Sequence, residues 1–383
     1  MPQSERDLFG VYTPQFNKDR IKQARELAGL TQEKLAHLVG VQQAWIAKVE
    51  NGRKSPSSEL MATIAHHTGM PLAFFAQESV LELGEGTLLF RAKASITRRQ
   101  EIEAKRHAEV ILEFAQRLAN RFNLLPVTLE PLREKPSVAA QIVRKKLGLD
   151  DGRPIPHLIR SIEKAGAFVL GVPYLDDRYA FAFWAGKDQC LPLIAVAEGS
   201  NADRLRFSVA HELGHLILHN RCFVVEDKRI ENEADEFAAE FLAPEREIKR
   251  ELMVQKITLE RLGELKQNWG LSIQALLRRS FELCVITERQ YRYLFQQIGM
   301  RGWRVHEPIQ YEISLEKPRL IRQMAEIIYG EPLNYALIAA DAHLTVEYVQ
   351  GILERYASSS DTQVASESTS KILHFPLLSG CTA

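Results

Sequence analysis

The residues best suited to chemistry are two histidines and a glutamate in the sequence HELGH. His211 and His215 are four positions apart, so in a helix both imidazoles project from the same face and can hold one zinc ion. Glu212 would face the open coordination position, where it can take a proton from water that the metal has acidified. The motif therefore predicts a zinc site that hydrolyses amide bonds.

A third ligand is predicted in the helical run RIENEADEFAAEFLAP. Glu231 lies 16 positions after His215, far enough for a turn and an antiparallel return. Two histidines, a glutamate and water form the usual ligand set of a hydrolytic zinc site. Asp235 shares the face of Glu231 and would accept the free N–H of a ligand imidazole. Glu233, on roughly the opposite face, is the alternative ligand.

A simpler interpretation makes these residues ordinary helix positions beside a solvated acidic face. It does not explain the polar pair of His211 and Glu212, which lies between the apolar runs FSVA and LILH. Polar groups buried there without partners would be costly. A bound metal ion supplies the missing partner, so the metal site is the preferred interpretation.

The stretches RLRFSVAHELGHLILH and ENEADEFAAEFLAP resemble the signature of the ImmA/IrrE family of metallopeptidases. The similarity spans roughly residues 137–290. Founding members of that family act on repressor proteins in mobile elements and in radiation response. The resemblance implies a zincin-like domain with a small sheet, a Zn²⁺ cofactor and a protein substrate such as a repressor.

The resemblance also implies a role for each residue of the motif. The ligands would be His211, His215 and Glu231, with Glu212 as the general base and Asp235 hydrogen-bonded behind a ligand. The group that stabilises the oxyanion is not identified, and Tyr179 and His219 are both candidates.

A second motif, TQEKLAHLVGVQQAWIAKVENGRKSPS, predicts two helices over residues 32–39 and 42–50 joined by a turn at Gly40. The second helix presents Gln42, Gln43 and Lys48 outward; amides suit adenine edges, and lysine suits guanine or phosphate. Residues 15–75 hold eight Lys and Arg against five Asp and Glu, a net charge of 8 − 5 = +3. The sequence therefore predicts a modestly basic surface for double-stranded DNA.

This region, residues 17–75, resembles the Cro/phage-repressor class of helix-turn-helix domains, including its VENGRKSP ending. The resemblance implies that Gln32 and Asn51 touch phosphates while Gln42, Gln43 and Lys48 face bases. Trp45 departs from the small polar residue usual at its position. A helical bundle used only for protein contacts is the alternative.

The fold class expected is α+β with helix in excess. Three stretches are typical of boundaries between folded segments. They are LELGEGT, the proline-containing LEPLREKPS and the Ser/Thr-rich SSSDTQVASESTSK. No internal repeat of roughly 20 to 50 residues is visible. The predicted segments are an N-terminal arm (1–14), the helix-turn-helix domain (15–78), a long helical connector (79–136), the metallopeptidase domain (137–290), a helical C-terminal region (291–356) and a disordered tail (357–383).

Composition bears on the class of the protein and on its cellular compartment. Its 49 basic and 49 acidic residues balance, and its four cysteines form no CxxC pair, which argues against a disulfide framework and a thiolate zinc site. No signal peptide or apolar run of about 18 residues is visible. We therefore expect a cytoplasmic protein without a membrane partner. The sequence is compatible with a homodimer.

Two functions fit these features. The first is a regulatory zinc endopeptidase guided by its DNA-binding domain. The second is a transcription factor whose zinc centre is structural or sensory and cuts nothing. Glu212 favours the first, because a structural site needs no base and usually has a fourth protein ligand.

Overall fold

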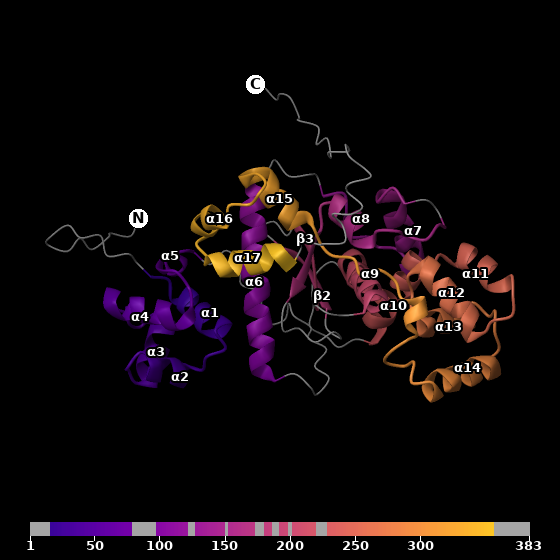
Figure 1. The fold of residues 1–383 in the computed structure, drawn as a ribbon, viewed down its shortest axis with the longest axis horizontal. Helices are drawn as coiled ribbons and strands as arrows, with labels where there is room; N and C mark the ends of the chain where they lie inside the picture. Colours follow the sequence, from indigo (N-terminus) through magenta and orange to yellow (C-terminus); the bar gives the residue numbers. More distant parts are fainter. Residues whose placement is uncertain are drawn as a thin grey trace, which may run out of the picture. The chain divides into compact units, whose positions relative to one another are not determined.

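The computed structural model describes residues 16–78, 97–121, 127–149, 152–172, 180–185, 191–197, 201–219 and 228–355. Helices account for most of these residues, and a single small sheet accompanies them (Figure 1). The helix-rich α+β prediction is therefore confirmed. The predicted N-terminal arm and disordered tail lie outside the described residues.

The chain divides into two compact units. The first comprises residues 1–118, 172–175 and 324–353, and the second comprises residues 119–171, 176–323 and 354–383. The C-terminal helices thus belong with the N-terminal segment in one compact unit. The segment bounds expected from the sequence stay a prediction.

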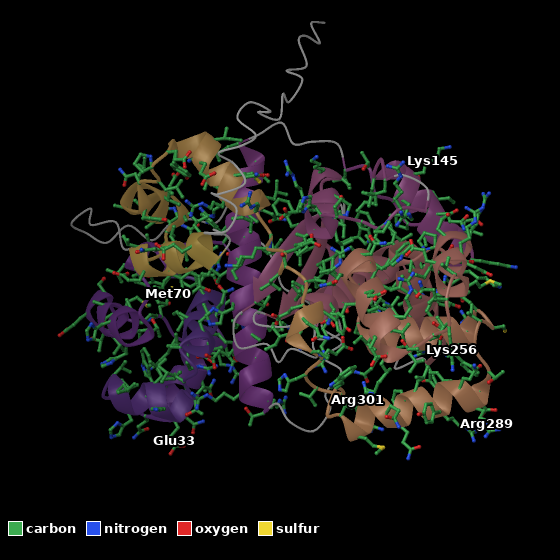
Figure 2. The ribbon with its side chains drawn as sticks, turned by 45° about the vertical axis from the view of Figure 1, so that its right-hand side comes forward. Glu33, Met70, Lys145, Lys256, Arg289 and Arg301 are labelled. Carbon is green, nitrogen blue, oxygen red and sulfur yellow. The ribbon has the colours of Figure 1, made fainter. Side chains whose placement is uncertain are left out.

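The first unit begins with five short helices. Asn17, Thr31 and Ser57 cap three of them, each accepting a backbone N–H with its side chain. Ile46 and Val49 are buried, as the helix-turn-helix pattern predicts, and Figure 2 shows Glu33 and Met70 on opposite sides of this group of helices. The helices are α1 (Lys18–Leu27), α2 (Gln32–Leu38), α3 (Gln43–Glu50), α4 (Ser58–Thr68) and α5 (Leu72–Phe75).

The long helix α6 (Arg98–Asn120) joins α1 through buried polar contacts. The Arg20 guanidinium donates to Glu113 of α6 at 2.7 Å, and the Arg106 guanidinium of α6 donates to Glu26 at 2.7 Å. Arg20 is only 1% exposed, so its charge depends on this partner. These ion pairs fix α6 against the first helix of the helix-turn-helix domain.

Three further helices complete the described C-terminal part of the chain: α15 (Leu320–Tyr329), α16 (Tyr335–Ala342) and α17 (Val346–Arg355). The Tyr348 ring of α17 stacks on His107 of α6, with ring centroids 5.7 Å apart and planes 6° apart. Residues far apart in the sequence therefore pack on α6.

The second unit contains a three-stranded sheet in the order β1-β3-β2. Its strands are β1 (Phe168–Val172), β2 (Ala180–Ala185) and β3 (Leu191–Ala197). β2 and β3 are antiparallel, with Ala182 opposite Ile194. β1 and β3 are buried throughout, which explains why they read as unbroken apolar runs.

The helices of the second unit share one apolar core with this sheet. They are α7 (Pro136–Lys146), α8 (Leu158–Lys164), α9 (Ala202–Leu218), α10 (Lys228–Leu242), α11 (Glu245–Met253), α12 (Leu259–Trp269), α13 (Ile273–Glu282), α14 (Glu288–Met300) and the 3₁₀ turn η1 (Ile309–Tyr311). Arg289 and Arg301 mark the two ends of α14 in Figure 2. Within the described ranges, no helix is both long enough and apolar enough to cross a bilayer.

The buried carboxyl group of Glu163, near the end of α8, binds the chain segment that follows η1. Glu163 accepts the backbone N–H groups of Arg319 and Leu320 at 3.0 and 3.1 Å. Burial raises the pKa of Glu163 to about 8, although these N–H groups and the Arg319 charge oppose the rise.

The free energy of unfolding should therefore depend on pH through Glu163. Its folded-state pKa lies above the ordinary value of 4.5, so its contribution is complete below pH 4.5 and is lost as pH rises through about 8. Between pH 5 and 9 the metal-free protein should lose on the order of a few kcal/mol. Glu163→Gln should remove most of this loss, whereas Glu312→Gln, an exposed control, should not. Equal pH profiles for wild type and Glu163→Gln in calorimetry would contradict the assignment.

Candidate metal centre and helix-turn-helix

Close packing between α9 and α10 builds the candidate metal centre. Gly214 of HELGH lies where these helices approach: a Cβ atom there would be 3.1 Å from the Phe237 ring and 3.3 Å from the Ala234 Cα. Such a contact would force the helices apart by a few tenths of an ångström. The role of Gly214 was not predicted from the sequence, although its place inside the motif is a signal.

Three donor groups meet across this helix pair. The Nε2 atoms of His211 and His215 are 3.0 Å apart, and the Glu231 carboxylate lies 3.4 Å from the first and 3.7 Å from the second. Two donors bonded tetrahedrally to zinc at about 2.0–2.1 Å should be roughly 3.3 Å apart. The donor set and its spacing therefore fit a tetrahedral zinc ion.

His211 is oriented by a carboxylate behind it. Its Nδ1 lies 2.9 Å from Asp235 Oδ1. If this nitrogen carries the proton and donates it to Asp235, the lone pair of the imidazole is left on Nε2, which faces Glu231. The structure thus brings Asp235 to the position expected from the i, i+4 spacing.

His215 is backed by a second histidine and a second carboxylate. Its Nδ1 is 3.2 Å from Nδ1 of His219, and His219 Nε2 is 3.0 Å from Glu233. Glu233 also lies 3.3 Å from Arg229. The alternative ligand Glu233 therefore faces His219 and stands apart from the three-donor group of the described residues.

Glu212 occupies the turn of α9 that carries both histidines and is 8% exposed. It is not among the three donors that group together in the described residues. Of the two oxyanion candidates, His219 lies behind His215, and Tyr179 falls outside the described residues.

Four of the five residues predicted to contact DNA are exposed. They are Gln42, Gln43 and Lys48, predicted to face bases, and Asn51, predicted to touch phosphate; Gln42 is the N-terminal cap of α3. Trp45 is half-buried, in line with a side chain that packs partly inward.

Gln32, the other predicted phosphate contact, already has a partner within the domain. Its Nε2 donates to Glu50 at 2.8 Å. Glu50 is buried and also accepts two hydrogen bonds from Arg25, at 2.6 and 3.1 Å. These bonds hold the start of α2 to the end of α3, a pairing that the sequence analysis missed because it joins residues 18 positions apart.

Comparisons with known proteins agree with both parts of the site. A helix-turn-helix family model matches residues 21–75. The model of an M78 peptidase family, described as an IrrE N-terminal-like domain, matches residues 175–281. No curated protein matches the chain. The chain thus contains an N-terminal segment similar to helix-turn-helix domains and a later segment similar to an IrrE N-terminal-like peptidase domain.

Proposed function

We propose that the protein is a DNA-binding regulator with zinc-dependent endopeptidase activity. The observation that carries this proposal is the group of His211, His215 and Glu231, whose donor atoms all lie within 4.8 Å of one another. The match to a metallopeptidase family supports it. The metal proposed is zinc, because imidazole and carboxylate donors at tetrahedral spacing suit that ion.

Zinc, when bound, lowers the pKa of water to about 7 and polarises the carbonyl of a peptide bond. Glu212 acts as the general base: its carboxylate takes a proton from the attacking water and passes it to the leaving nitrogen. Asp235 accepts the Nδ1 proton of His211. His219 accepts the Nδ1 proton of His215 and donates its own Nε2 proton to Glu233. Both ligand imidazoles therefore present their Nε2 lone pairs.

Three donors among the described residues, rather than four, support hydrolysis over a purely structural metal site. The helix-turn-helix would bring the peptidase to double-stranded DNA and to proteins bound there. A repressor is the substrate class that this arrangement favours, and the cytoplasm is the compartment where both would meet. A transcription factor with a non-catalytic zinc centre is the alternative.

Metal content tests the ligand assignment. Purified wild-type protein should hold about one zinc per chain, and His211→Ala, His215→Ala and Glu231→Gln should each lose it, because two remaining ligands make a weak site. Glu236→Gln makes the same change at an exposed position of α10 and should retain zinc. Near-stoichiometric zinc in the histidine variants would contradict the site.

Peptide cleavage tests the role of Glu212. Glu212→Gln should bind zinc and DNA like wild type but cleave about 10²- to 10⁴-fold more slowly, because a general base typically contributes that much. The assay would incubate zinc-loaded protein with the products of neighbouring genes. Cleavage by this variant at the wild-type rate would favour another base, and regulation by it in cells at wild-type level would favour the transcription-factor alternative.

The His219–Glu233 pair should govern zinc affinity through His215. His219→Leu should weaken zinc binding about 10- to 100-fold, the usual effect of losing a group that orients a ligand. His219→Gln should recover most of the affinity, since its amide can accept from His215 and donate to Glu233. Competition with a chromophoric chelator measures both. Equal loss in the two variants would indicate that His219 is itself a ligand, and no loss in either would contradict the role.

DNA binding should depend on the exposed face of α3. Gln43→Ala should reduce discrimination between a selected duplex and random DNA by roughly 1 to 3 kcal/mol. Lys48→Ala should weaken binding and lower the salt dependence, whereas Lys22→Ala, an exposed change on α1, should do neither. If wild-type protein shows no preference for any duplex selected from a random library, the domain binds protein instead.

A further inference from the structure

The last two helices of the first unit repeat the architecture of α2 and α3. Residues 334–353 correspond to residues 31–50 without a gap, at a constant offset of 334 − 31 = 303 positions. Each segment opens with a capping side chain: Thr31 and Asn334 both accept the backbone N–H three positions later, each at 3.1 Å. The helices that follow start at matching positions.

The turns between the helices also match. Gly40 has φ 71° and His343, at the equivalent position, has φ 56°, so both occupy the left-handed region. The next residue, Val41 or Leu344, donates its N–H to the carbonyl five positions earlier, at 2.9 and 3.0 Å. A histidine in this conformation is uncommon, which makes the agreement informative.

The apolar contacts repeat as well, since every core position of the first motif has a buried apolar equivalent in the second. The pairs are Leu35 and Ile338, Ala36 and Ala339, Val39 and Ala342, Ile46 and Val349, and Val49 and Ile352. α16 and α17 therefore form a second helix-turn-helix. The sequence search found no repeat because Ala36 and Ala339 are the only identical pair in the two segments.

The exposed face of the second motif lacks the chemistry of a DNA-reading helix. Where α3 presents Lys48, α17 has Gly351, and where α3 presents Ala44, α17 has exposed Glu347. A carboxylate is repelled by phosphates, and glycine can neutralise none. The second motif therefore has no counterpart of the basic contact that the first one offers.

Two residues of the second motif contact or lie near α6. Tyr348, at the position equivalent to Trp45, stacks on His107 of α6, and its hydroxyl lies 2.8 Å from His107 Nδ1. Leu344 of the turn lines a small cavity together with Phe114 of α6 and Arg20 of α1. The second motif thus packs where α6 meets the first helix of the DNA-binding domain.

We propose that residues 334–353 are a second helix-turn-helix that has a protein partner in place of DNA, and that this partner is α6 of the same chain. The contact of Tyr348 with α6 helps to hold α6 against α1. In this arrangement α3 is the helix that faces DNA. This role does not depend on zinc or on peptidase activity.

Two lysine substitutions in the full chain test which motif faces DNA. Ala44→Lys and Glu347→Lys place a lysine at equivalent positions of α3 and α17, with charge changes of +1 and +2 respectively. With random-sequence duplex DNA, Ala44→Lys should change the slope of log affinity against log salt by about one. Glu347→Lys should leave affinity within about twofold and the slope unchanged. A slope change of about one in Glu347→Lys would overturn the proposal.

Hydrogen exchange tests whether the contact between Tyr348 and His107 stabilises α6. Tyr348→Ala should speed exchange of the α6 amides near His107 about tenfold, the factor that corresponds to 1.4 kcal/mol. His107→Ala tests the same contact from the other side if the first variant does not fold. Unchanged exchange in whichever variant folds would overturn the role of α17, irrespective of the DNA result.

Discussion

The close approach of α9 and α10 is the constraint on which the candidate site depends. Neither helix alone supplies all three candidate metal ligands: α9 carries the two imidazoles, four positions apart, and α10 carries the carboxylates. Gly214 leaves room for α10, and only at that separation does Glu231 lie within 3.4 to 3.7 Å of both histidines. Backbone packing therefore determines the spacing of the three candidate donors, while Asp235 contacts His211 and His219 contacts both His215 and Glu233.

A different interaction organises the first unit. Buried arginines and glutamates connect α1, α3 and α6: Arg25 of α1 pairs with Glu50 at the end of α3, and Arg20 of α1 pairs with Glu113 of α6. Such pairs contribute little net stability, but removing one member leaves a buried charge. They therefore specify how the helices fit together. Tyr348 of α17 and Leu344 lie against the same stretch of α6, at His107 and Phe114 respectively.

Local spacing explains what the sequence could predict. The i, i+4 pair of His211 and His215 and the Gly-centred turn of the first motif are encoded within a few residues, so helix geometry alone specifies them. The preference for Glu231 over Glu233 also came from local spacing, because the two residues lie on roughly opposite faces of one helix. The bond between Gln32 and Glu50, the pairing of His219 with Glu233 and the repeat at residues 334–353 depend on tertiary contacts or on burial, which residue identity does not reveal.

X-ray absorption at the zinc edge of the zinc-loaded protein measures the ligand set of the candidate metal centre. We predict a four-coordinate ion with two imidazoles and two oxygens at about 2.0–2.1 Å, one from Glu231 and one from water. His219→Gln should leave this spectrum unchanged, because His219 lies behind His215. A wild-type spectrum with three imidazoles, or with a sulfur ligand near 2.3 Å, would contradict a site made of His211, His215 and Glu231.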